Sequence, residues 1–168
     1  KGFFDNVNHG KLLKQIWTLG IRDKRLICII SKMLKAEIDG EGVPEKGTPQ
    51  GGLLSPLLSL IVLNELDWWV SSQWETFQPK NRSKNGWLQY AKKYTKLKSG
   101  FIVRYADDFK IMCSTYGEAQ RFCHSTVDFL NKRLKLEISP EKSKVVNLKK
   151  NSSDFLGFKI KVIPKGRT

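Results

Sequence analysis

The feature that most constrains this sequence is a pair of adjacent aspartates between two short apolar segments. Residues 101–105 and 109–114 are rich in apolar and aromatic side chains, as strands are, and Asp107-Asp108 occupy the turn that joins them. Two neighbouring carboxylates beside a core repel each other, and a divalent cation would relieve that repulsion. Hard oxygen ligands of this kind suit Mg²⁺. The pattern therefore predicts a hairpin with a cation site at its tip, although aspartate also favours ordinary turns.

Around this hairpin, the spacing of apolar residues predicts mostly helices. Helices are expected over residues 11–19, 23–35, 53–69 and 117–134, a short hairpin over 36–46, a glycine-rich loop over 47–52, and strands over 144–148 and 155–163. Helices, a strand pair, another helix and further strands, in that order, predict an α+β fold with an antiparallel sheet packed against helices. The length of 168 residues fits a single domain, residues 1–168.

The charge of the chain predicts a polyanionic partner. Thirty Lys and Arg residues against sixteen Asp and Glu residues leave a net charge of +14. A small basic domain usually binds nucleic acid, although a solvated lysine face or a membrane surface would also fit. Basic residues concentrate in two places, residues 75–98 and 141–167. Residues 70–100 are interpreted as a basic insertion or connection between motifs.

Apolar runs and cysteines indicate a cytoplasmic protein without a membrane partner. The longest apolar run, residues 57–63, is too short to span a bilayer. The three cysteines, Cys28, Cys113 and Cys123, are odd in number and lack CxxC spacing. This pattern favours buried thiols in a reducing cytosol over disulfides or a zinc site.

Four segments together resemble the palm motifs of reverse transcriptases, in the form found in bacterial group II intron-encoded enzymes. Residues 105–108 read YADD, which resembles the family's YxDD box. Residues 47–58 read GTPQGGLLSPLL and resemble the preceding box. Residues 1–9 read KGFFDNVNH and resemble the end of the first palm box, while residues 155–158, FLGF, resemble a later one. The four segments occur in the family's order and cover most of the chain, so the resemblance implies a reverse-transcriptase-like palm.

The resemblance implies catalysis by two metal ions, Mg²⁺ with Mn²⁺ as a substitute. Asp107 would be the principal ligand from the hairpin, and Asp108 a supporting or primer-side ligand. Tyr105 would contact the primer or template end. The segment containing Phe155, Leu156 and Gly157 would grip the primer.

The resemblance also implies a nucleotide pocket. Phe4 corresponds to the aromatic residue that lies under the sugar and excludes a 2′-hydroxyl, although core packing is the alternative. Gln50 and Gly51 would lie beside the incoming nucleotide, where glycine permits close approach of the backbone. Lys142 would lie near the triphosphate, with Lys144 as a rival and a solvated turn lysine as the plainer reading.

Two further residues of the first motif receive structural interpretations. The motif normally starts with a catalytic aspartate two positions before the residue that corresponds to Lys1, so this ligand is expected outside the chain. Asp5 matches a second, non-ligand aspartate and is expected to cap the following segment or pair with a basic residue. His9 is a lone histidine, which is more often structural than a ligand.

The resulting functional prediction is an RNA-directed DNA polymerase of a mobile group II intron, whose parent protein also acts as a splicing maturase. Its expected partners are an RNA template, a DNA primer, dNTPs and the intron RNA. The alternative is a non-catalytic RNA-binding maturase palm, because the chain, expected to be truncated at both ends, lacks the first aspartate and should be inactive alone. A cyclase-type or CRISPR-type palm would share the acidic hairpin but lack the Pro-Gln-Gly-Gly box. Open palm edges predict self-association.

Overall fold

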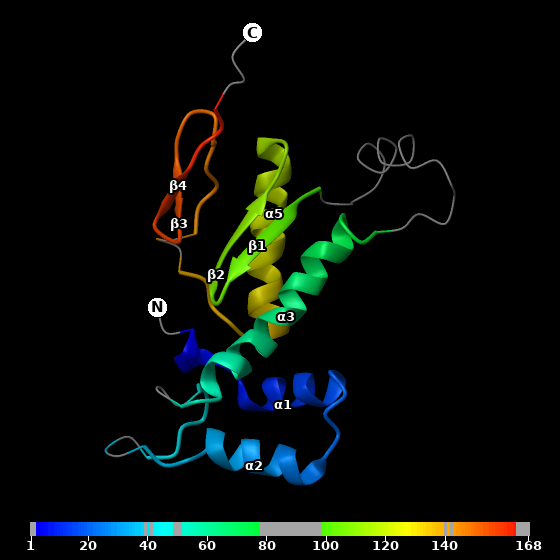
Figure 1. Ribbon diagram of the computed structural model, residues 1–168, viewed down its shortest axis with the longest axis vertical. Helices are drawn as coiled ribbons and strands as arrows, with labels where there is room; N and C mark the ends of the chain where they lie inside the picture. Colours follow the sequence, from blue (N-terminus) through cyan, green and yellow to red (C-terminus); the bar gives the residue numbers. More distant parts are fainter. Residues whose placement is uncertain are drawn as a thin grey trace. The chain divides into compact units, whose positions relative to one another are not determined.

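The computed structural model describes residues 3–38, 40, 42–48, 52–77, 99–139, 141 and 143–163 (Figure 1). The predictions for Gln50, Gly51 and Lys142, and for most of the 70–100 insertion, lie outside these residues. The chain divides into two compact units, Lys1–Val70 with Ser125–Ser139, and Ser71–His124 with Pro140–Thr168. The assignment of residues 1–168 to one domain stays a prediction.

The first unit is helical. It contains the 3₁₀ turn η1 (Phe4–Asn6), helices α1 (His9–Thr18) and α2 (Lys24–Leu34), most of α3 (Ser55–Gln73), and the π-helical turn η2 (Leu130–Leu134). Two side chains start the first helices by accepting hydrogen bonds from free backbone N–H groups: Asn8 accepts from Lys11 N at 2.9 Å, and Asp23 accepts from Arg25 N at 2.7 Å. The three helices predicted for this part of the sequence are confirmed. The cap at Asn8 explains why α1 begins before residue 11.

An apolar stripe of α3 forms the centre of this unit's core. Leu58, Val62, Leu66 and Val70 recur every four residues and are all buried. They belong to a core completed by other buried side chains of the unit: Val7, Leu12, Ile16, Ile30, Leu34, Leu63, Leu130, Leu134 and Leu136. Each fully buried aliphatic side chain contributes roughly 1.5–3 kcal/mol to folding, so this core holds the helices in place.

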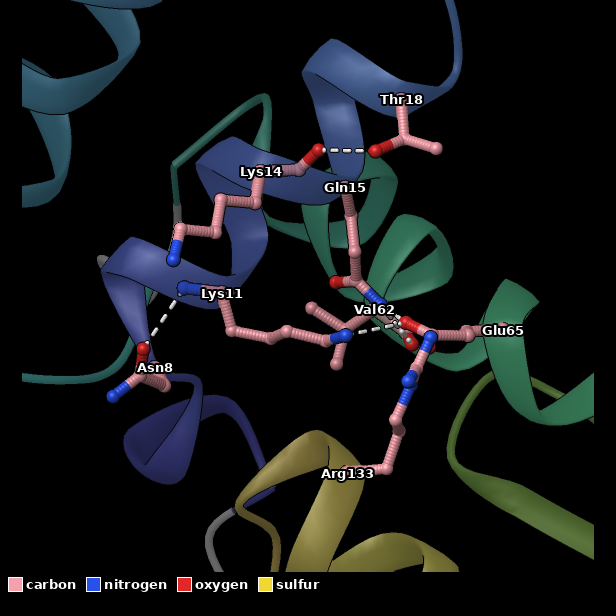
Figure 2. Close-up of polar contacts among 8 residues, drawn as sticks. All are labelled: Asn8, Lys11, Lys14, Gln15, Thr18, Val62, Glu65 and Arg133. Carbon is pink, nitrogen blue, oxygen red and sulfur yellow. Dashed lines mark hydrogen bonds and ion pairs between the residues drawn. The ribbon is translucent and has the colours of Figure 1, made fainter.

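A partly buried carboxylate ties three elements of the first unit together (Figure 2). Glu65 of α3 pairs with Lys11 of α1 at 2.7 Å, accepts a hydrogen bond from Gln15 at 2.8 Å, and accepts another from Arg133 Nε of η2. Gln15 also donates to the Val62 carbonyl at 3.2 Å. Burial raises the pKa of Glu65, but the hydrogen bonds from Lys11, Arg133 and Gln15 outweigh it, so the net pKa is lowered.

This network predicts acid-dependent stability. A carboxylate whose folded pKa is lowered stabilises the fold above its unfolded pKa, roughly 4.3, and loses that contribution as pH falls through the folded value. We expect Glu65→Gln to lower the free energy of unfolding by about 1–3 kcal/mol at pH 7 and to flatten its fall below pH 5. Denaturant melts between pH 3 and pH 7 measure both effects. Asp128→Asn, which breaks an exposed pair with Lys132, is the matched control and should change little. Equal acid profiles for Glu65→Gln and the unsubstituted protein would contradict this role.

The second unit is built on two antiparallel hairpins. Strand β1 (Phe101–Tyr105) pairs with β2 (Asp108–Met112), and β3 (Ser153–Phe155) pairs with β4 (Phe158–Ile160). Helix α5 (Tyr116–Phe129) starts in this unit at a capping box, in which Thr115 and Glu118 bond each other's backbone N–H groups. Figure 1 shows the first hairpin beside the first part of α5, which belongs to the same unit.

Close packing holds this hairpin on the helix. A Cβ at Gly100 would lie 2.7 Å from the Phe122 ring of α5 and 3.1 Å from the Ile111 side chain of β2. Phe122 is only 1% exposed. The predicted α+β fold, with an antiparallel sheet packed against helices, is confirmed, although each described sheet has two strands.

Several local predictions were wrong. Asp108 is the first residue of β2, not part of the turn. Residues 143–147 form no strand. Within residues 36–46 there is an isolated bridge between Ile38 and Gly42, and Lys46 bridges Asn8 instead. Residues 155–163 do not form one strand, because the chain reverses at Leu156-Gly157, where both residues have positive φ (53° and 81°). The alternation of apolar and basic residues continues through this turn, so the sequence pattern did not predict the turn.

Two further findings concern membrane spans and cysteines. Among the described helices, none combines the length and apolar character needed to span a bilayer. All three cysteines are free, but Cys28 is exposed and Cys113 and Cys123 are only partly buried, so the prediction of buried thiols was wrong for Cys28 and holds only in part for the other two. Cys28 lies on the side of α2 that faces away from the buried Ile30 and Leu34. Burial, with a smaller contribution from Glu118, raises the pKa of Cys113 to about 11, which keeps that thiol protonated and unreactive.

Candidate active site

The acidic hairpin presents its two carboxylates to solvent. Tyr105 pairs with Asp108 across the strands, so only Ala106 and Asp107 form the loop. Ala106 has a φ of 52°, unusual for a residue with a Cβ, and the Arg104 guanidinium donates to the Ala106 carbonyl at 2.7 Å. Tyr105 is 65% exposed, and both aspartates are exposed. The short loop thus fixes the backbone beneath side chains that are open to a ligand.

The chemistry of these donors fits a divalent cation. Asp107 and Asp108 provide hard oxygen atoms, and Mg²⁺ commonly uses one or two carboxylates together with substrate phosphates. Within the part of the chain that the structure describes, no group of three His, Cys, Asp or Glu side chains gathers into a metal site. The hairpin by itself therefore offers a partial ligand set, and the assignment of both aspartates as ligands stays a prediction.

In the first unit, the first motif and the start of the glycine-rich loop lie against each other. Thr48 N donates to the Phe4 carbonyl and Gly47 N donates to the Val7 carbonyl, both at 2.7 Å. Lys46 bridges Asn8. Residues 4–8 and 46–48, about forty positions apart in the sequence, are therefore joined by their backbones. Phe4 is half-buried at this junction.

Gly47 permits this close approach. It has a φ of 99°, and a Cβ there would lie 3.2 Å from the Asp5 Cα and from the carbonyl oxygens of Phe4 and Asp5. A side chain at this position would combine a strained backbone with crowding against another backbone. Glycine is therefore required for the junction to form as it does.

His9 also lies at this junction, although the sequence predicted only a structural role for it. Its Nε2 lies 2.7 Å from the Gly47 carbonyl oxygen, and its side chain is buried. A signal was present in the sequence, because His9, Leu12 and Ile16 share one face at helical spacing and all three are buried. Asp5 lies within η1 and does not cap α1, since Asn8 does. The capping alternative predicted for Asp5 was therefore wrong.

The second hairpin carries the residues predicted to contact the primer. Phe155 ends β3 and is half-buried, whereas Leu156 and Gly157 form the exposed tip. Phe158 is 76% exposed, and Lys159 and Lys161 are exposed beside it. Aromatic and basic side chains together suit contacts with bases and phosphates. The role of these residues in binding primer stays a prediction.

Comparison with known proteins decides the family. A family model described as "Reverse transcriptase (RNA-dependent DNA polymerase)" matches residues 1–160, nearly the whole chain. The chain belongs to the reverse transcriptase family. The resemblance inferred from the four motifs is thereby confirmed. Members of this reverse transcriptase family generally use divalent metal ions, which agrees with the donors on the acidic hairpin.

Relatives of this reverse transcriptase chain include intron-encoded proteins. It is 31% identical to "Group II intron-encoded protein LtrA" of Lactococcus lactis subsp. cremoris over 208 residues, covering 99% of this chain and 34% of LtrA. It is 28% identical to "Protein YkfC" of Escherichia coli K12, covering 94% of this chain and 44% of YkfC. It is 26% identical to "Putative COX1/OXI3 intron 2 protein" of Saccharomyces cerevisiae, covering 96% of this chain and 23% of the yeast protein. The chain thus spans about a third of the length of LtrA.

Proposed function

We propose that the whole protein is an RNA-directed DNA polymerase of a mobile group II intron and that it also assists splicing of the intron RNA. The observation that carries the proposal is the hairpin that presents Asp107 and Asp108 to solvent in a chain of the reverse transcriptase family. Similarity to the intron-encoded LtrA supports the link to intron RNA. An RNA template, a DNA primer, dNTPs and the intron RNA are the proposed partners, in the cytoplasm.

Asp107 and Asp108 would hold Mg²⁺ in this reaction, with Asp107 as the principal ligand. When bound, the metal would make the primer 3′-hydroxyl more acidic and neutralise charge on the phosphates. Asp107 on the short loop and Asp108 at the start of β2 would each contribute a negative charge on a hydrogen-bonded backbone, so little reorganisation is needed when substrate arrives. A bound cation would relieve the repulsion between the two neighbouring carboxylates, which favours a positively charged ligand at this tip.

The remaining candidate residues would bind and select substrate. Phe4, held by its backbone to Thr48, would place its ring against the sugar and exclude a 2′-hydroxyl by clash. Gln50 and Gly51, two and three positions after Thr48 in the sequence, would lie beside the nucleotide, with Lys142 near the triphosphate. The second hairpin, with Phe155, Leu156 and Gly157, would hold the primer: the exposed Phe158 ring would stack on a base, and the neighbouring lysines would attract the phosphates.

Primer extension by the whole protein tests this function. With an RNA template, a DNA primer, dNTPs and Mg²⁺, we expect extension that stops when EDTA removes the metal and resumes with added Mg²⁺ or Mn²⁺. Ca²⁺, which accepts looser geometry, should support binding better than chemistry. Gel separation of the products measures the result. Extension that persists in EDTA would reject metal-dependent polymerisation, and RNA binding without extension would favour a maturase palm that lacks the chemistry.

A further inference from the structure

The junction between the first motif and the glycine-rich loop is held by a side chain as well as by its backbone. The carbonyl oxygen of Gly47 can only accept, so the His9 ring must donate its Nε2 hydrogen across the 2.7 Å contact. The same Gly47 donates its N–H to the Val7 carbonyl, and the next residue, Thr48, donates to the Phe4 carbonyl. His9 thus holds the Gly47–Thr48 peptide group, whose N–H, that of Thr48, bonds to the Phe4 carbonyl.

Burial at this junction is costly for a residue that only fills space. His9 is 5% exposed, and its Nδ1 has no hydrogen-bond partner among the described residues. Thr48 is also 5% exposed, and its hydroxyl oxygen likewise has no hydrogen-bond partner among the described residues. An aliphatic or phenyl side chain would fill the His9 position without a bare buried nitrogen. The feature that only a donor side chain supplies is the bond to Gly47.

We propose that His9 is a positioning residue for selection of the nucleotide sugar. This inference rests on the proposed polymerase function and deepens it. The His9 ring fixes Gly47, Gly47 fixes Thr48, and the Thr48 N–H fixes the backbone of Phe4. A ring that excludes a 2′-hydroxyl by clash discriminates only if it cannot move away. Without the His9 bond, Phe4 gains room to shift and a ribonucleotide is admitted more readily.

A pair of substitutions separates the hydrogen bond from the volume of the ring. His9→Phe keeps an aromatic ring of similar size and removes the donor, whereas His9→Gln keeps an N–H near the place of Nε2. In primer extension by the whole protein, we expect His9→Phe to raise the kcat/KM for an rNTP relative to its dNTP about tenfold. The change should lie mainly in KM, with kcat for the dNTP nearly constant. His9→Gln should recover most of the discrimination.

Amide hydrogen exchange tests the positioning without any activity. In His9→Phe we expect the N–H groups of Gly47 and Thr48 to exchange at least about tenfold faster, while Ala119 N–H of α5 stays unchanged as an internal control. Asp107→Asn should reduce extension about a thousandfold and leave exchange at Gly47 and Thr48 unaltered. If the unsubstituted protein shows no extension, the proposed function is wrong. Exchange would then still show whether His9 holds Gly47 and Thr48 in place.

Two results would overturn the role of His9. One is unchanged exchange at Gly47 and Thr48 in His9→Phe. The other is unchanged sugar discrimination in His9→Phe; if its thermal stability is also reduced, His9 contributes packing alone. If His9→Phe fails to fold, His9→Asn, whose shorter amide does not reach the Gly47 carbonyl, replaces it in the same two measurements with the same expected results.

Discussion

Replacing Asp107 with asparagine is expected to reduce primer extension by the whole protein about a thousandfold. Asparagine keeps the size of the side chain and is at home in turns, so the loop between β1 and β2 should form unchanged. The substitution removes the negative charge that holds the metal. Metal ions contribute several kcal/mol of transition-state stabilisation, and each 1.4 kcal/mol lost lowers the rate tenfold. Single-turnover extension with saturating dNTP measures the chemical step.

A matched aspartate shows whether charge alone explains the loss. Asp128 lies on α5 with its side chain 66% exposed and pairs with Lys132. Asp128→Asn makes the same chemical change and should leave extension within about twofold and stability within about 0.5 kcal/mol. If Asp107→Asn extends primers as well as Asp128→Asn does, Asp107 is not a metal ligand in this reaction. Binding of the RNA–DNA duplex should be similar in both variants, because the loss lies in catalysis.

The parts of the fold that follow local rules could be predicted from the sequence. Helix α2 has an aspartate at its start and apolar residues at helical spacing, and β1 ends where predicted because the turn residues follow at once. The acidic hairpin needed a correction of one residue, because a two-residue loop draws Asp108 into the ladder opposite Tyr105. Local preferences and the final structure agree at these places.

The contacts between distant segments could not be predicted in this way. Nothing in residues 46–48 indicates that they pair with residues 4–8, since that pairing depends on the burial of His9 and the positive φ of Gly47. The turn at Leu156 was missed for a related reason, because leucine rarely adopts a positive φ. The candidate residues came from motifs, which identify chemistry but do not say which side chains support it. His9 is one of the supporting side chains, which no motif identified.

Gly47→Ala is expected to produce the largest loss of stability among simple glycine substitutions in the first unit. A φ of 99° costs an alanine about 1–3 kcal/mol, and its Cβ would also crowd the backbone of Phe4 and Asp5 at 3.2 Å. Relief of that crowding would move residues 46–48 away from Phe4. A loss of about 2 kcal/mol corresponds to a melting temperature roughly 4–8 °C lower, which calorimetry measures. Sugar discrimination in primer extension should weaken as well, since the same junction carries Phe4.

Two other glycines separate the contribution of backbone strain from that of crowding. Gly20 has nearly the same φ, 104°, but a Cβ there meets nothing within 4 Å, so Gly20→Ala should show the strain alone. Gly10 lies inside α1, where alanine is favoured, and a Cβ there would lie 3.6 Å from the Asn8 side chain, an ordinary contact. We therefore expect Gly10→Ala to gain up to about 1 kcal/mol, Gly20→Ala to lose some stability, and Gly47→Ala to lose more. Equal losses at Gly20 and Gly47 would mean that the loop does not rest against Phe4 and Asp5, and the basis for a shared nucleotide pocket would then be gone.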